Sequence, residues 1–185
     1  MYSENYNKDT DQEAVALIGF RLDPQNESPD LYTLLIYGGE HDFPFVVNEQ
    51  IIFFRNPQLS VKVASLLPSN MPSELRDKGI TPTVPELICD IAKSLHIIES
   101  ENKDDSSIIL NCINIFTDLV PATGISMPAM YKDILNRFAG HLTFNREFGD
   151  FLRQENISRN EIIDAILWCI GAITVKVKLC QAEEG

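Results

Sequence analysis

The chain has 185 residues, of which 44% are apolar and 23% charged, and its formal net charge is −12. This length allows one sizeable core or two small lobes that share one core. No run of about 18 apolar residues occurs, and the first residues are polar and acidic, so we expect neither a membrane span nor a secretory signal and assign the chain to the cytoplasm.

The negative charge is concentrated in the N-terminal half. Residues 1–50 carry ten acidic and two basic residues, whereas residues 106–185 carry nine acidic and seven basic ones. Without a basic patch a surface cannot neutralise phosphate groups, so this distribution disfavours binding to nucleic acid and to anionic membranes. It favours an encounter with a basic protein, although an acidic surface can also serve solubility alone.

The N-terminal part predicts an antiparallel sheet. Aromatic and β-branched residues predict strands at 14–22, 31–37, 43–47 and 50–55. A dense group of turn formers at 23–30 separates the first two strands. Because all the connections are short, we predict a four-stranded antiparallel meander.

A helix and a connector are predicted after the sheet. Pro57 suits the first turn of a helix that Asn56 caps, and the apolar pattern predicts that this helix reaches residue 67. We therefore divide the chain into a sheet with one helix, residues 1–67, a proline-rich connector, residues 68–83, and a helical part, residues 84–185. The helical part is expected to pack on the sheet, which makes one compact α+β unit.

About five helices are predicted in the helical part, because apolar residues recur there at helical spacing. A capping box of Thr83 and Glu86 predicts that the first helix includes Leu87 and Ile88. The next helices are predicted at three places: 106–120, 126–142 and around 148–152. Another capping box, formed by Ser158 and Glu161, starts the last one.

The segment "ITVKVKLC" at 173–180 fits two structures. It alternates like a strand, but Ile173, Val177 and Cys180 also continue the apolar stripe of the preceding helix. We favour a helix because the longer pattern fits it, although the run of β-branched residues lowers helix propensity.

The segment "FPFVVNEQIIFF" at 43–54 is apolar on both faces of its two strands. A sheet with one face in water would alternate apolar and polar residues instead. Five or six large apolar side chains left in water would forgo on the order of 10 kcal/mol of stability. We therefore expect the 57–67 helix to cover one face and the helical part the other. The alternative is that a second copy or a partner covers one face.

The sequence contains no motif that assigns a reaction. Neither the cysteines nor the histidines have metal-ligand spacing, and we expect no cofactor and no metal. The cysteines are predicted to be small core residues: Cys89, Cys112, Cys169 and Cys180. The nearest fragment to a serine-nucleophile elbow, Gly124-Ile125-Ser126, lacks the second glycine, and we interpret Ser126 as a helix cap.

The first functional hypothesis is a non-catalytic acidic protein-binding domain. In its most specific form it is an inhibitor or immunity-type protein that neutralises a basic toxin or nuclease. Acidic residues in and after the turns would attract the basic partner. These candidate contact residues are Asp23, Glu27, Asp30, Glu40 and Asp42.

The alternative hypothesis is an enzyme or small-ligand binder with a pocket between the sheet and the helical part, since such junctions often hold ligands. His41, Asp42 and His141 are the first residues to inspect for that activity. A homo-oligomer formed through the sheet is a third alternative.

Overall fold

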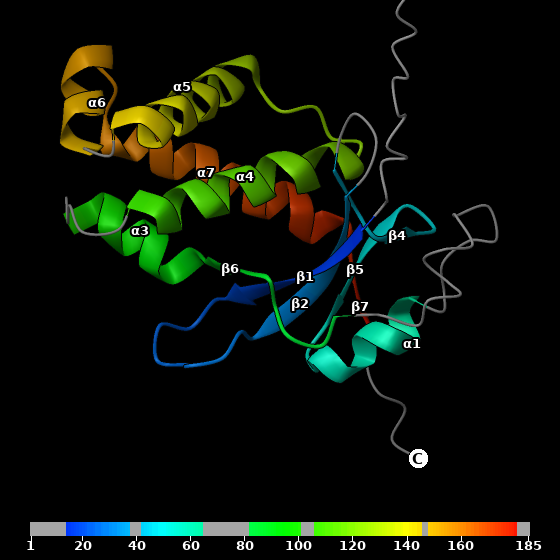
Figure 1. The fold of residues 1–185 in the computed structure, drawn as a ribbon. Helices are drawn as coiled ribbons and strands as arrows, with labels where there is room; N and C mark the ends of the chain where they lie inside the picture. Colours follow the sequence, from blue (N-terminus) through cyan, green and yellow to red (C-terminus); the bar gives the residue numbers. More distant parts are fainter. Residues whose placement is uncertain (1–13, 38–41, 65–81, 101–105, 146–147, 181–185) are drawn as a thin grey trace, which may run out of the picture.

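The computed structural model describes residues 14–37, 42–64, 82–100, 106–145 and 148–180. These residues form a mixed sheet, most of it from the N-terminal half, followed by five helices in the C-terminal half (Figure 1). The α+β class is therefore confirmed. The predicted division at a connector, residues 68–83, stays a prediction because most of that segment lies outside the described residues.

The sheet contains seven strands within the described residues. Their bounds are β1 (Ala14–Arg21), β2 (Leu31–Tyr37), β3 (Phe43–Pro44), β4 (Val46–Val47), β5 (Gln50–Phe54), β6 (Leu87–Asp90) and β7 (Val177–Cys180). The strand order is β4-β5-β2-β1-β6, with β3 paired to β2 and β7 paired to β5. Strands β1 to β5 are the four predicted N-terminal strands, the third of which is divided into β3 and β4.

The helices of the described residues are η1 (Pro57–Leu59), α1 (Ser60–Ala64), α3 (Ile91–Ser100), α4 (Ser106–Ala122), α5 (Ala129–Asn145), α6 (Phe148–Glu155) and α7 (Arg159–Val175). Two predicted caps are confirmed. The Asn56 side chain accepts from the N–H of Gln58, and Ser158 and Glu161 form a reciprocal capping box. The predicted residues 65–67 of the first helix lie outside the described part.

Two expected helix starts are wrong, each for a local reason. Residues 87–90 form β6, which runs parallel to β1 with Asp90 opposite Arg21, and α3 starts only at Ile91. Pairing with an open strand edge thus overrides the helical pattern. The helix expected to start at Ser126 begins at Ala129, because the carbonyl of Pro128 accepts the first helical bond, from the N–H of Lys132.

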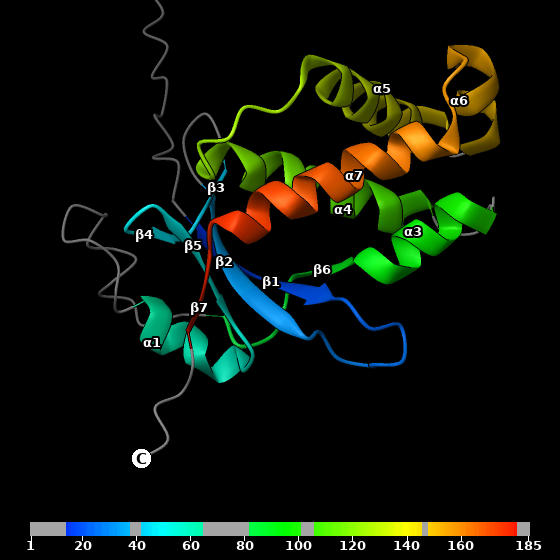
Figure 2. The same cartoon turned by 180° about the vertical axis from the view of Figure 1, so that it is seen from behind.

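The ambiguous segment 173–180 is divided between a helix and a strand. Helix α7 ends at Val175, and β7 then pairs in parallel with β5, with Val177 opposite Ile51 (Figure 2). The prediction of a helix is therefore correct up to Val175 and wrong for residues 177–180. For residues 177–180 the alternating pattern of a strand is the correct predictor, because the edge of β5 is available for pairing.

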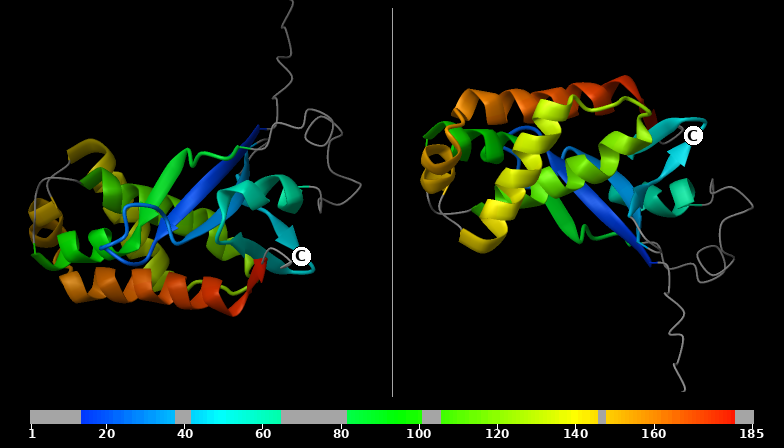
Figure 3. Two further views of the ribbon diagram at one scale, coloured as in Figure 1. Left: turned by 90° about the horizontal axis from the view of Figure 1, so that it is seen from below. Right: turned by 90° about the horizontal axis from the view of Figure 1, so that it is seen from above.

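Both faces of the sheet are buried, as the sequence predicts. On one face Ile18, Phe20 and Phe53 pack in a core shared with helices α3 to α7. On the other face Leu17 and Phe54 pack in a second core together with residues of η1 and α1. Seen from above, helix α4 lies across the strands, whereas seen from below α1 and the strands come to the front (Figure 3).

Replacing Phe54 by alanine is expected to lower the free energy of unfolding by about 3–5 kcal/mol, because its ring is fully buried in the second core. Urea denaturation measures this loss. Phe144→Ala is the control, since Phe144 is 85% exposed, and it is expected to change stability by less than about 0.5 kcal/mol. Equal effects of the two substitutions would mean that the second face is not packed.

Candidate functional site

The five predicted contact residues do not come together in the structure. Asp23, Glu27 and Asp30 lie in the loop between β1 and β2, at one end of the sheet (Figure 1). Asp42 follows β2 and therefore lies near the other end of this strand, which is roughly 20 Å long. Glu40 lies outside the described residues. We name residues 22–30 the acidic loop.

The acidic loop is held in place by its own hydrogen bonds. The Asp30 carboxylate accepts from the N–H of Leu22 at 2.7 Å, from the N–H of Asp23 at 3.1 Å and from the side-chain amide of Asn26 at 2.5 Å. These hydrogen bonds hold the pKa of Asp30 below its ordinary value, and the bond from the N–H of Leu22 has the largest effect. Asp30 thus stabilises the loop, while the exposed Asp23 and Glu27 carry charge at its surface.

An ion pair behind the loop connects it to the helical part. Arg21 Nη1 lies 2.8 Å from Asp90 Oδ2, and these side chains are only 23% and 8% exposed. Arg21 Nη2 also donates to the carbonyl of Glu27, and Asp90 accepts from the N–H of Lys93 in the first turn of α3. The pair therefore joins the loop, β1, β6 and α3. Neither partner was predicted from the sequence, because only the parallel pairing of β1 with β6 places them opposite each other.

An apolar cavity of about 150 Å³ lies beside the acidic loop, between the sheet and the helices. We name it the sheet cavity. Its lining residues are almost all apolar: Phe20, Leu22, Leu31, Phe53, Ile91, Phe116, Ile170, Ile173, Thr174 and Val177. A neighbouring hollow of about 360 Å³ shares Leu22 and Leu31 with it and adds Asp30 and Arg55. Leu22, which is 49% exposed, thus lies between the charged loop and the apolar cavity.

The sheet cavity lies where a pocket was predicted, but the residues proposed for that pocket lie elsewhere. Neither Asp42 nor His141 lines it. The His141 ring packs against Phe151, with ring centroids 5.3 Å apart, and His41 lies outside the described residues. Of the three residues proposed for this pocket, the two that the structure describes, Asp42 and His141, therefore lie outside the sheet cavity.

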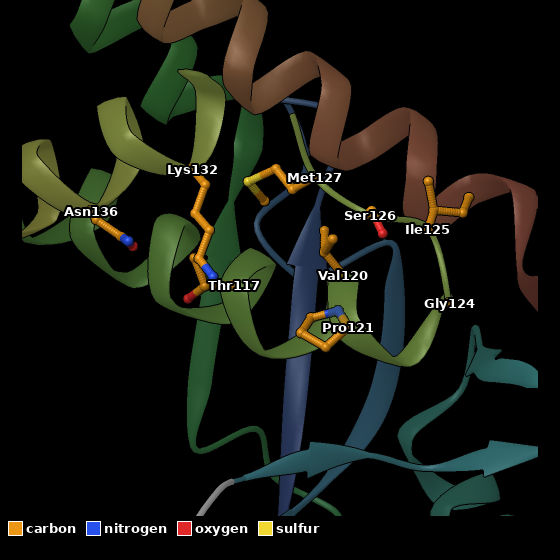
Figure 4. A pocket seen from close by; sticks show the side chains of 9 residues that line it. All are labelled: Thr117, Val120, Pro121, Gly124, Ile125, Ser126, Met127, Lys132 and Asn136. Atoms are coloured by element: carbon orange, nitrogen blue, oxygen red, sulfur yellow. The ribbon is translucent and has the colours of Figure 1, made fainter. Parts of the chain in front are cut away.

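A second cavity, of about 500 Å³, lies between the end of α4, the following loop and the start of α5 (Figure 4). We name it the helix cavity. Nine residues line it: Thr117, Val120, Pro121, Gly124, Ile125, Ser126, Met127, Lys132 and Asn136. From the sequence, part of its wall was interpreted only as an incomplete nucleophile elbow. A further signal in the sequence is the combination of Pro121 near a helix end with Lys132 and Asn136 one turn apart.

Asp42 belongs to a group of acidic side chains around the C-terminal end of β2. Burial, and then the charge of Asp42, raise the pKa of Asp118 on α4 to about 6. Burial also raises the pKa of Tyr37, and the charges of Glu86, Asp42 and Asp118 add to this effect. Asp118 therefore carries a proton at a pH at which an exposed aspartate is fully charged.

Replacing Asp118 by asparagine is expected to stabilise the fold in a pH-dependent manner. Between about pH 4 and pH 6 the unfolded chain releases this proton more readily than the folded chain, because the pKa rises from 3.8 to about 6 on folding. The wild type thus loses stability relative to Asp118→Asn as the pH rises through this range, and the difference is constant above it. Urea denaturation of both proteins from pH 4 to pH 8 measures the difference, and a constant value throughout would contradict this assignment.

The cysteines are largely core residues, as predicted. Cys89, Cys112 and Cys169 are buried, whereas Cys180 is partly exposed. Sγ of Cys89 and Sγ of Cys112 are 3.0 Å apart, and Ser94 Oγ donates to the Cys112 sulfur at 3.1 Å. Burial raises the pKa of the Cys89 thiol well above its ordinary value and that of Cys169 to about 11. Protonated, buried thiols are poor nucleophiles.

The described residues contain no group of three or more His, Cys, Asp or Glu side chains that could hold a metal ion. None of their helices has the length and hydropathy needed to cross a lipid bilayer.

Comparisons with known proteins identify no family for this chain. No family model matches the sequence, no curated protein is similar to it, and no solved structure matches it. Function must therefore be argued from the geometry of the acidic loop and the two cavities.

Proposed function

We propose that this chain is a non-catalytic, cytoplasmic protein-binding domain whose partner is a basic protein. The observation that carries the proposal is the position of the acidic loop, which hydrogen bonds fix beside an apolar cavity. A loop that is already ordered loses less conformational entropy when it binds. Charged and apolar contacts next to each other are also the usual composition of a protein interface.

The two parts of this surface would contribute differently to binding. The exposed carboxylates of Asp23 and Glu27 attract the partner over a distance and raise the association rate. Leu22 and the sheet cavity receive an apolar side chain of the partner, and this contact slows dissociation. A partner segment with lysine or arginine next to a large apolar residue would fit both the acidic loop and the sheet cavity.

The most specific form of the proposal is an inhibitor or immunity-type protein that neutralises a basic toxin or nuclease. It is supported by the charge of the chain and by its size. A strongly negative surface speeds association with a basic enzyme, and fast association is what a neutralising protein needs.

The sheet cavity also supports a second candidate function, the binding of a small apolar ligand. Its walls come from both the sheet and the helices, and polar groups are nearly absent from them. A molecule bound there would be held by burial of apolar surface rather than by hydrogen bonds. Its entrance would lie beside Leu22 and Arg55.

The proposal predicts that the acidic loop decides partner binding. The full chain is immobilised as wild type and as Asp23→Asn/Glu27→Gln, and proteins captured from an extract of the native cells are quantified by mass spectrometry. A protein with a basic surface is expected to bind the wild type and to be lost from the loop variant. With the purified partner, the association rate is expected to fall about tenfold or more as salt rises from low to high concentration.

Asp133→Asn/Asp164→Asn is the matched control, because it removes the same charge from helices α5 and α7 and is expected to capture the partner as the wild type does. Leu22→Ser is expected to speed dissociation and to leave the association rate unchanged. Equal capture by the loop variant and the control, or an association rate independent of salt, would refute the proposed function.

A further inference from the structure

The helix cavity has a polar end and an apolar end. Figure 4 shows Lys132 extending from α5 toward Thr117 on α4, with Asn136 on the same side of the cavity. Val120, Ile125 and Met127 lie on the opposite side, where Ser126 adds one hydroxyl group. A volume of about 500 Å³ is ordinary for a small-molecule site, and so is a mainly apolar wall with a few convergent polar groups.

The charge at the polar end is positive. Lys132 is the only ionisable residue among the nine that line the cavity, in a chain whose net charge is −12. Within the described residues its ammonium group makes no ion pair, whereas the nearby Asp133 on α5 pairs with Arg137. A cation in a cavity wall that has no ion-pair partner among the described residues favours an anionic ligand.

The backbone of α4 adds a hydrogen-bond acceptor at the same end. Pro121 lies inside this helix and has no N–H, so the carbonyl of Thr117 lacks the helical bond that residue 121 would otherwise donate. Both residues line the cavity. The Thr117 hydroxyl donates to the carbonyl of Asn114, which leaves its oxygen able to accept from a ligand.

We propose that the helix cavity binds a small organic carboxylate with a short apolar body. Lys132 binds the carboxylate, and the amide of Asn136 donates a second hydrogen bond to it. Val120, Ile125 and Met127 contact the apolar body. A hydroxyl or amino group on the ligand would find its acceptor at Thr117. This site is separate from the acidic loop, so it is independent of the proposed protein partner.

Nuclear magnetic resonance titration of the ¹⁵N-labelled full chain tests this site with three probes: butanoate, hexanoate and benzoate. At least one of them is expected to shift the amide signals of Gly124, Ile125 and Met127. Hexan-1-ol has the apolar body without the charge, and it is expected to bind about tenfold more weakly than hexanoate, because a hydrogen bond to a charged group is lost.

Lys132→Gln is expected to weaken carboxylate binding by about tenfold or more. Lys178→Gln on β7 is the control, because it removes the same charge from an exposed position outside the cavity. Both side chains are exposed, so neither variant should impair folding, and urea denaturation verifies this. If none of the three carboxylates shifts these signals, or if both variants bind as tightly as the wild type, the proposal is wrong.

Discussion

Side chains along β5 alternate between two buried faces of the sheet, and this constraint determines the rest of the fold. Ile51 and Phe53 belong to the core under the helices, while Ile52 and Phe54 belong to the second core with α1. Since both faces must be kept from water, the sheet needs a layer on each side. Both faces of the sheet are thereby covered by other elements. The acidic loop and the cavities lie where strands and helices end.

The helical part, residues 84–185, contributes two strands as well as helices, and both strands bear on the candidate sites. Strand β6 places Asp90 opposite Arg21, and this ion pair holds the base of the acidic loop against α3. Strand β7 places Val177 in the wall of the sheet cavity. The geometry beside the acidic loop thus depends on strand pairings between residues that are distant in sequence, whereas the charge of the loop comes from its own residues.

Local sequence signals predicted the parts of the fold that depend on neighbouring residues. Strands β1, β2 and β5, the Asn56 cap and the Ser158 capping box follow from such signals. The pairings of β6 and β7 could not be predicted, because a short apolar segment becomes a strand or a helix according to the edge available to it. The separation of Asp42 from the acidic loop was predictable, since consecutive loops of an antiparallel meander lie at opposite ends of its strands. The helix cavity depends on how α4 and α5 pack, which local signals do not specify.

Native-state hydrogen exchange of β5 tests the central claim most directly, because its neighbouring amides bond to opposite sides of the strand. The N–H of Ile51 donates to the carbonyl of Lys176 at 2.8 Å, and that of Ile52 donates to the carbonyl of Phe45 at 3.1 Å. If the C-terminal strand completes a doubly covered sheet, both amides exchange only through global unfolding, with the free energy found by denaturation. Fast exchange at Ile51 together with slow exchange at Ile52 would contradict this account, because the C-terminal strand would then not be part of the stable sheet.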